Sequence, residues 1–250
     1  WIDFSPRSQF KLISISILYH KIMFKHIYQI NEQAFIIDFG SIINTEINNN
    51  VINYHNYILS NIDKIKSLGI KNCVPSYNKI LIQFDPFLKN KSKILKYLNS
   101  IKIKDINNIK NNKIIKIPIC YDEKYAIDLN DVSKKTKLSK NQIIDIHLNT
   151  IFHVFMIGFM PGLPFLGILD KKLSVLRKSS PRVNVEKGSV AIADKMCVIY
   201  PNNSPGGWNI IGKTPLDLFN KNKKNPLLIQ PGNKVQFHLI NKKDFHLYDK

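Results

Sequence analysis

The stretch from residue 158 to 215 constrains the fold more than any other part of this 250-residue chain. It contains the runs G-F-M-P-G-L-P-F-L-G at 158–167 and Y-P-N-N-S-P-G-G-W-N-I-I-G-K-T-P at 200–215. Glycine and proline at this density predict rigid turns, which hold the aromatic residues between them at fixed positions. We therefore interpret the stretch as a pocket wall rather than a linker.

Residues 26–112 have the pattern of a small α+β domain. Short apolar runs predict strands, and apolar residues at a spacing of three to four predict helices. The resulting β-α-β-β-α order is typical of a ferredoxin-like domain, with helices on one face of an antiparallel sheet. The predicted elements are a strand at 34–39, a helix from Thr45 to Gly69, strands at 74–77 and 79–84, and a helix that opens at 85–86.

Residues 113–250 show a different pattern, which begins after a Lys- and Asn-rich link at 102–113. A strand at 114–120 and a helix from Ser139 to Thr150 are followed by short β-branched runs between Gly and Pro turns. This arrangement predicts a mainly β domain, either a barrel or a sandwich. The runs lie at 152–157, 189–193, 196–200, 208–211, 227–230 and 234–240. Residues 1–25 stay unexplained as an N-terminal extension.

The formal net charge of +19 does not by itself indicate a nucleic-acid partner. Arginine occurs only at 7, 177 and 182, and the lysines are spread along the whole chain. Nucleic-acid sites cluster their cations with aromatic residues, so we expect a solvated surface instead. The three cysteines form no C-x-x-C pair, which favours a reducing, cytoplasmic setting. The apolar run at 12–19 is too short to span a membrane.

The letters from Gly207 to Thr214 satisfy the G-x-x-x-x-G-K-T pattern of a phosphate-binding loop. Such a loop presents backbone N–H groups and runs into a helix. Here Trp208, Ile210 and Ile211 favour a strand, so we reject a phosphate-binding loop at this place.

Several side chains are candidates for a site. Pro161 and Gly162 would hold aromatic neighbours at a pocket mouth, and Arg182 could clamp a carboxylate through its planar guanidinium. His147 has a pKa range suited to proton transfer, although an ordinary helix-surface histidine is the simpler interpretation. Ser189 and Ser204 have no G-x-S-x-G context, so a serine-hydrolase triad is not supported. The histidines and cysteines show no zinc-ligand spacing.

Together with the P-R pair at 181–182 and G-S-V-A-I-A at 188–193, the two long runs resemble the family of 5-oxoprolinase B subunits, also called carboxyltransferase B subunits, allophanate hydrolase subunit 1 or sporulation kinase inhibitors. The resemblance extends over roughly residues 28–240. It implies an N-terminal α+β domain followed by a cyclophilin-like β-barrel. Phe165 and Phe152 stand where relatives usually carry tyrosine, which removes two hydroxyl groups.

The resemblance also implies a function. The chain would be the B subunit of an ATP-dependent 5-oxoprolinase, which hydrolyses the cyclic amide 5-oxoproline (pyroglutamate) to L-glutamate together with a cyclophilin-like C subunit and an A subunit. The complex would use ATP at a site that the sequence does not locate. Implied roles are proton transfer for His147 and substrate binding for Phe159, Pro161, Gly162, Phe165, Arg182, Ser189, Ser204, Gly206, Gly207 and Trp208.

Two alternatives stay open at the level of sequence. Relatives also bear the name of inhibitors of a sensor histidine kinase, which would make this chain a regulatory binding protein. Others belong to biotin-dependent urea carboxylases, in which a carboxyltransferase component uses carboxybiotin. Genes for the A and C subunits beside this one would favour the oxoprolinase, and a biotin carboxylase gene would favour the carboxyltransferase.

Overall fold

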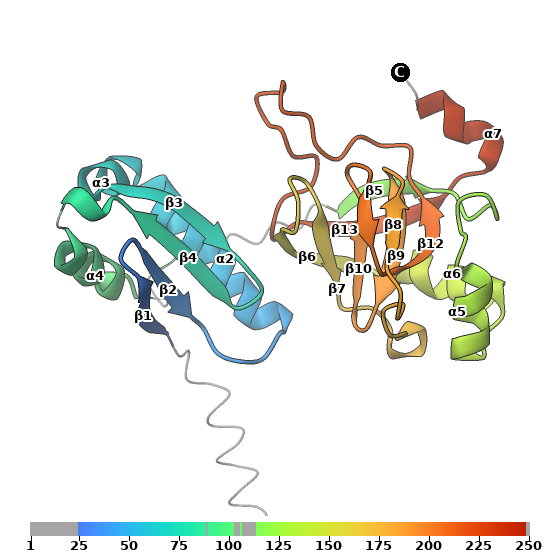
Figure 1. Ribbon diagram of the computed structural model, residues 1–250, viewed down its shortest axis with the longest axis horizontal. Helices are drawn as coiled ribbons and strands as arrows, with labels where there is room; N and C mark the ends of the chain where they lie inside the picture. The colour runs from blue at the N-terminus through green and yellow to red at the C-terminus, as the bar shows by residue number, and fades with distance from the viewer. Residues whose placement is uncertain (1–24, 89, 103–105, 107–113, 249–250) are drawn as a thin grey trace, which may run out of the picture.

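Two separate apolar cores organise the chain, one in each of two lobes that lie side by side (Figure 1). The computed structural model describes residues 25–88, 90–102, 106 and 114–248. The N-terminal extension through residue 24 and most of the predicted link at 102–113 lie outside the described residues. The predicted domain boundaries at 26–112 and 113–250 stay predictions.

The smaller lobe is an antiparallel sheet with helices packed on its apolar face. The sheet has the order β1-β2-β4-β3, and apolar residues of β2, β4, α2, α3 and α4 share one core. From β2 to α4 the elements follow the predicted order, but the mostly exposed strand β1 was not predicted. The ferredoxin-like assignment therefore stays a prediction. The elements are β1 (His26–Asn31), β2 (Ala34–Asp38), α2 (Thr45–Ser60), α3 (Ile62–Leu68), β3 (Ile70–Pro75), β4 (Lys79–Phe84), η1 (Pro86–Leu88) and α4 (Lys91–Ser100).

Local signals explain the limits of the helical segment between β2 and β3. The Asn44 side chain accepts a hydrogen bond from the Ile47 N–H at 2.8 Å and so caps the start of α2. Gly69 ends α3 with a left-handed φ of 72°, which glycine adopts without a steric penalty. The predicted helix from Thr45 to Gly69 is thus divided into two at Asn61.

The larger lobe contains a seven-stranded sheet that is nearly closed into a barrel. Its order is β12-β9-β10-β7-β6-β13-β5, and the two outer strands meet through a bridge between Cys120 and Lys213. Each of these residues donates its N–H to the other's carbonyl, at 2.9 and 3.0 Å. A Cβ at position 212 would lie 2.9 Å from Ile119 Cδ1 and 3.0 Å from the Cys120 carbonyl oxygen, so glycine favours this close approach.

Most of the predicted strands are present in this sheet, and the predicted barrel is compatible with it. The run at 227–230 was predicted wrongly, since it shows only an isolated bridge between Leu227 and Phe219. The cyclophilin-like assignment stays a prediction. The strands are β5 (Ile114–Ile119), β6 (Phe152–Ile157), β7 (Pro164–Gly167), β9 (Ser189–Ala193), β10 (Met196–Ile199), β12 (Asn209–Lys213) and β13 (Lys234–Leu239).

The remaining elements surround the barrel. Helices α5 (Leu129–Thr136) and α6 (Lys140–Asn149) add apolar residues to the barrel core. Ser139 and Gln142 form a reciprocal capping box at the start of α6, which agrees with the predicted start of this helix at Ser139. Strands β8 (Arg182–Val185) and β11 (Ser204–Gly206) form a separate two-stranded sheet. Short helices η3 (Lys171–Leu173), α7 (Lys242–Phe245) and η4 (His246–Tyr248) complete the fold.

The lobes touch through α2 and the β3–β4 turn on one side and through β6 and β7 on the other. Asn48 Nδ2 donates to the Phe155 carbonyl at 3.0 Å, and His153 Nε2 donates to Asn48 Oδ1 at 2.6 Å. The Tyr77 ring lies 5.8 Å from the rings of both Phe155 and Phe165. The small lobe therefore packs on the outer face of the barrel wall.

Candidate functional site

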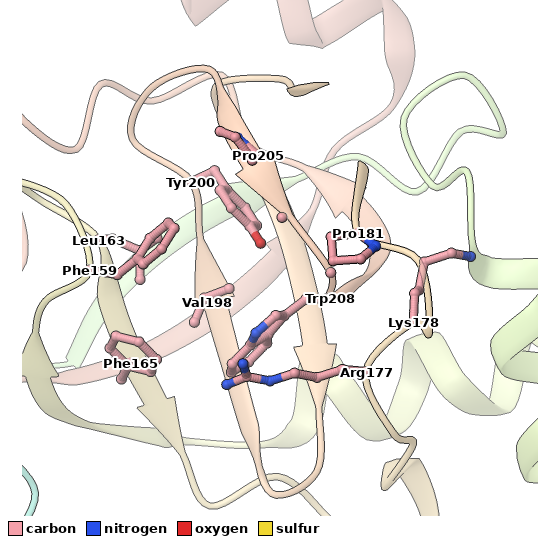
Figure 2. A pocket seen from close by; sticks show the side chains of 12 residues that line it. Phe159, Leu163, Phe165, Arg177, Lys178, Pro181, Val198, Tyr200, Pro205 and Trp208 are labelled. Carbon is pink, nitrogen blue, oxygen red and sulfur yellow. The ribbon is translucent and has the colours of Figure 1, made fainter. Parts of the chain in front are cut away.

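A cavity of about 310 Å³ lies on the barrel wall (Figure 2). Its size is at the lower end of the range for small-molecule sites. The walls come from the turn before β7, from β7 and β10, from the residue after β10, from the loop at 174–181, from β11, and from the chain between β11 and β12. The lining residues are Phe159, Leu163, Phe165, Arg177, Lys178, Pro181, Val198, Tyr200, Pro205, Gly206, Gly207 and Trp208.

The cavity lies on the outside of the barrel, because successive residues of a strand point to opposite faces. On β10, Cys197 belongs to the core inside the barrel, whereas Val198 belongs to a smaller apolar cluster of the same lobe and lines the cavity. On β7, Leu166 likewise points inward and Phe165 outward. We call this space the outer cavity.

The turn between β6 and β7 carries Phe159 to the rim of the outer cavity. Gly162 has a φ of 86°, and a Cβ there would lie 2.4 Å from Phe219 Cβ, so the turn needs glycine. Phe159 itself has a left-handed φ of 69° and is 73% exposed. A bulky residue in this backbone region is strained, and such strain concentrates at functional sites.

Arg177 supplies a cation beside the aromatic wall. Its guanidinium lies 5.3 Å from the centre of the Trp208 ring, which is within the range of a cation–π contact. The loop that carries it is fixed by two hydrogen bonds: Lys178 N–H donates to the Gly207 carbonyl at 2.7 Å, and Asn209 Nδ2 donates to the Leu176 carbonyl at 2.9 Å. The position of the Arg177 backbone is therefore set by the barrel.

A buried carboxylate, Asp128, anchors the same loop from behind. Its Oδ1 accepts from Lys178 Nζ at 2.9 Å and from an Arg182 Nη atom at 2.5 Å, and its Oδ2 accepts from the Ile210 N–H at 2.8 Å. Burial acts to raise the pKa of Asp128, but these hydrogen bonds outweigh it and hold that pKa below its usual value. Arg182 Nη1 is buried without a hydrogen-bond partner among the described residues.

His147 lies inside the barrel. Its Nδ1 is 2.7 Å from the Tyr121 hydroxyl, its Nε2 is 3.5 Å from Cys197 Sγ, and its ring packs against Phe152 and Phe237. Burial lowers the pKa of His147 to about 3 and raises the pKa of the Cys197 thiol. The histidine is therefore neutral at physiological pH and has no route to the outer cavity through this closed core.

The predicted site residues divide into two groups. The structure brings Phe159, Phe165, Gly206, Gly207 and Trp208 together around the outer cavity. The other predicted residues do not line the cavity. Pro161 and Gly162 lie in the turn between β6 and β7, and Ser189 and Ser204 lie in β9 and β11. Arg182 binds Asp128, and His147 lies in the barrel core.

Sequence reasoning missed seven lining residues. Arg177 was noticed only as one of three arginines, although its rarity in this chain is the signal that could have found it. Leu163, Pro181, Tyr200 and Pro205 lie within the motifs quoted above but were given no role. Lys178 and Val198 lie outside these motifs, and only the fold brings them to the cavity. The missed residues are Leu163, Arg177, Lys178, Pro181, Val198, Tyr200 and Pro205.

The segment from Gly207 to Thr214 is no phosphate-binding loop. Residues 209–213 form β12, which pairs antiparallel with β9, and Lys213 binds Glu186. Among the described residues, no group of three or more His, Cys, Asp or Glu is placed to hold a metal ion. No helix in the described part of the chain is both long and apolar enough to cross a bilayer.

Comparison with known proteins identifies the family. Residues 25–229 match the model of the carboxyltransferase domain, subdomains C and D. The chain belongs to this family. It is 34% identical to the B subunit of 5-oxoprolinase from Bacillus subtilis, over 89% of this chain and 95% of that protein. It is 36% identical to the Haemophilus influenzae protein of the same name, over 68% and 76% of the two chains.

A solved structure shares the fold of this chain, and a more distant relative matches most of its sequence. The crystal structure of TTHA0988 superposes with a TM-score of 0.75 at 27% identity, covering 83% of this chain and 40% of that one. Urea amidolyase of Saccharomyces cerevisiae is 23% identical over 86% of this chain, which corresponds to 13% of the larger protein. Some relatives therefore carry this unit within a longer polypeptide, and the curated bacterial relatives are named as subunits of an enzyme.

Proposed function

We propose that this chain is the B subunit of an ATP-dependent 5-oxoprolinase complex, which opens 5-oxoproline to L-glutamate with the help of the C and A subunits. The observation that carries the proposal is the match to nearly the whole length of a bacterial protein that bears this name. The outer cavity has a size that suits a small ligand. We propose that this cavity receives the ring of the substrate.

The outer cavity suits a small, flat ring with polar edges. Phe165 and Trp208 form an aromatic corner, with ring centres 6.0 Å apart and planes inclined at 70°. Gly206 lets the Tyr200 hydroxyl lie against the cavity wall, because a Cβ at position 206 would lie 2.4 Å from this hydroxyl. Apolar walls with a few polar groups are the usual composition of a site that fixes the orientation of a small ligand.

Opening a lactam requires an input of free energy, since the amide is resonance-stabilised and its nitrogen is a poor leaving group. ATP would supply this input in the complete complex by activating the amide oxygen. Residues 209–213 offer no cradle for its phosphates, because they form a paired strand. We therefore assign this chain the tasks of binding the ring, orienting it and excluding water, and we place no step of ATP chemistry on its residues.

The test is reconstitution with the A and C subunits of the proposed complex. We expect glutamate release from 5-oxoproline to require ATP and to disappear when this chain is omitted. As a control for assembly, the remaining subunits are assayed with the Phe87→Ala variant, which alters a 90% exposed residue of the small lobe and should support full activity. Equal glutamate release with and without this chain would remove the proposal.

The second candidate is a carboxyltransferase component of a biotin-dependent carboxylase. The family description and the similarity to urea amidolyase favour it. This function predicts transfer of labelled bicarbonate to urea, with a biotinylated partner and without glutamate release. Running both assays on the same preparation separates the two candidates.

A further inference from the structure

The outer cavity contains one cation that forms no ion pair with any carboxylate of the described residues. Its charged lining residues are Arg177 and Lys178. Lys178 Nζ lies 2.9 Å from Asp128 Oδ1 and 3.7 Å from Asp131 Oδ2. Arg177, in contrast, has no carboxylate within 4.0 Å among the residues that the structure describes. The positive charge available to a ligand therefore comes from Arg177.

The Arg177 side chain is held in place although it is exposed. Figure 2 shows it lying alongside Trp208, at the 5.3 Å separation given above. A guanidinium that stacks on a ring keeps its N–H donors free at its edge, where they can form paired hydrogen bonds to a carboxylate. Trp208 can therefore orient the cation without using its hydrogen-bonding capacity.

Two phenol groups lie within the electrostatic reach of Arg177. Burial raises the pKa of Tyr77 to about 12 and also raises the pKa of Tyr200, while Arg177 acts against both shifts. Both groups are therefore neutral at physiological pH and add no negative charge near the guanidinium. An anionic ligand at this place would meet an unopposed cation.

We propose that Arg177 is the residue that selects for a carboxylate on a small ring ligand, and that Arg182 positions the 174–181 loop through Asp128. The geometry supports this division: Arg177 lines the cavity, whereas Arg182 lies behind its wall with Asp128. The identity of the ring as 5-oxoproline rests on the proposed function. The selection for a carboxylate on the ring rests instead on the lining of the outer cavity.

The experiment compares two ligands that differ in the carboxylate alone. Binding of 5-oxoproline and of 2-pyrrolidinone to the full chain is measured by titration calorimetry for the wild type, Arg177→Gln and the control Lys172→Gln. Lys172 is an exposed cation in η3 outside the cavity lining. We expect Arg177→Gln to weaken 5-oxoproline binding about 10- to 100-fold, as for a lost charged hydrogen bond. Binding of 2-pyrrolidinone to that variant and of both ligands to the control should stay within about twofold.

Other outcomes overturn the inference. Equal weakening of both ligands by Arg177→Gln would assign the residue a packing role on Trp208. An unchanged affinity of Arg177→Gln for 5-oxoproline would show that Arg177 does not contact the ligand. Failure of the wild type to bind any ring carboxylate at millimolar concentration would also reject the proposal.

A third probe separates this inference from the proposed function. Cyclopentanecarboxylate has the ring and the carboxylate but no lactam. If its binding depends on Arg177 while glutamate release does not require this chain, the proposed function fails and the inference stands. If the complex releases glutamate with an unchanged KM in the Arg177→Gln variant, the proposed function stands and the inference fails.

Discussion

Polar side chains on the two faces of the barrel wall have different environments. Inside, both ring nitrogens of His147 have partners, Tyr121 and Cys197, and the group is fully buried. Outside, Arg177 is exposed beside Trp208 with its N–H donors free of carboxylates among the described residues. A saturated, buried network stabilises a fold, whereas unsatisfied donors at a cavity can serve a ligand.

The largest expected effect comes from Asp128, which connects the loop on the outer face to strand β12. Asp128→Ala leaves Lys178, Arg182 and the Ile210 N–H without their shared acceptor. We expect it to lower the free energy of unfolding by about 3 kcal/mol, as for the removal of one partner of a buried ion pair. Guanidinium unfolding at neutral pH measures this.

Asp131→Ala is the matched control for that loss. Asp131 is 3.7 Å from the same lysine, but its side chain is 53% exposed, so its pair is screened by solvent. We expect a change within about 0.5 kcal/mol. Similar losses in the two variants would show that the Asp128 network adds nothing beyond a surface ion pair.

The second effect is a pH dependence that belongs to the buried histidines. Burial lowers the pKa of His147 to about 3 and that of His153 to about 4, against about 6.5 in an unfolded chain. Between these values the unfolded state binds protons that the native state does not, so stability falls as the pH falls. The expected slope is about 1.4 kcal/mol per pH unit for each histidine.

The variant His147→Gln tests the contribution of the inner face. Between roughly pH 6 and pH 5 its slope should be lower than that of the wild type by about 1.4 kcal/mol per pH unit, although the variant is less stable at every pH. Guanidinium unfolding at several pH values in this window gives the free energy of unfolding at each pH, and hence its slope. A slope equal to that of the wild type would mean that His147 is not held neutral inside the barrel.

Much of the fold could be predicted because its signals are local. The capping residues Asn44, Gly69 and Ser139 mark helix ends in the sequence, and the structure confirms them. Strand β1 has no apolar run, since most of its residues are exposed at the edge of a sheet, and its pattern therefore gave no strand signal. Residues 227–230 are mostly apolar but have no partner strand among the described residues, so the same rule predicted a strand that does not form.

The site could be predicted only where turns fix the side chains. Glycine and proline marked the turns that place Phe159, Phe165 and Trp208, and these three residues meet at the outer cavity. Arg177 reaches it from a loop whose course depends on hydrogen bonds to distant residues. His147 is near the first motif in sequence, but closure of the barrel places it on the opposite face, which no local pattern records.

A third prediction uses two neighbours on β10 to compare the faces directly. Val198→Phe places an aromatic ring in the outer cavity, and we expect at least about tenfold weaker binding of 5-oxoproline. Because Val198 is buried among apolar neighbours, the larger side chain should also cost about 1–3 kcal/mol of stability. Cys197→Ala should cost about 1 kcal/mol of stability through the inner core and leave affinity unchanged. Reduced affinity in Cys197→Ala would contradict the separation of the two faces.

The smallest expected effect on stability belongs to Phe159 at the rim. Because its side chain is 73% exposed, Phe159→Ala should change stability by less than about 0.5 kcal/mol and weaken 5-oxoproline binding about three- to tenfold. Phe159→Gly should be more stable than Phe159→Ala by up to about 1 kcal/mol, since glycine adopts the left-handed φ of 69° without strain. Calorimetric titration and thermal unfolding of both variants provide the measurements, with Phe87→Ala as the exposed aromatic control. If the Phe159→Gly variant proves less stable than Phe159→Ala, the left-handed φ of residue 159 does not persist in solution. Phe159 would then have no fixed position at the rim of the outer cavity.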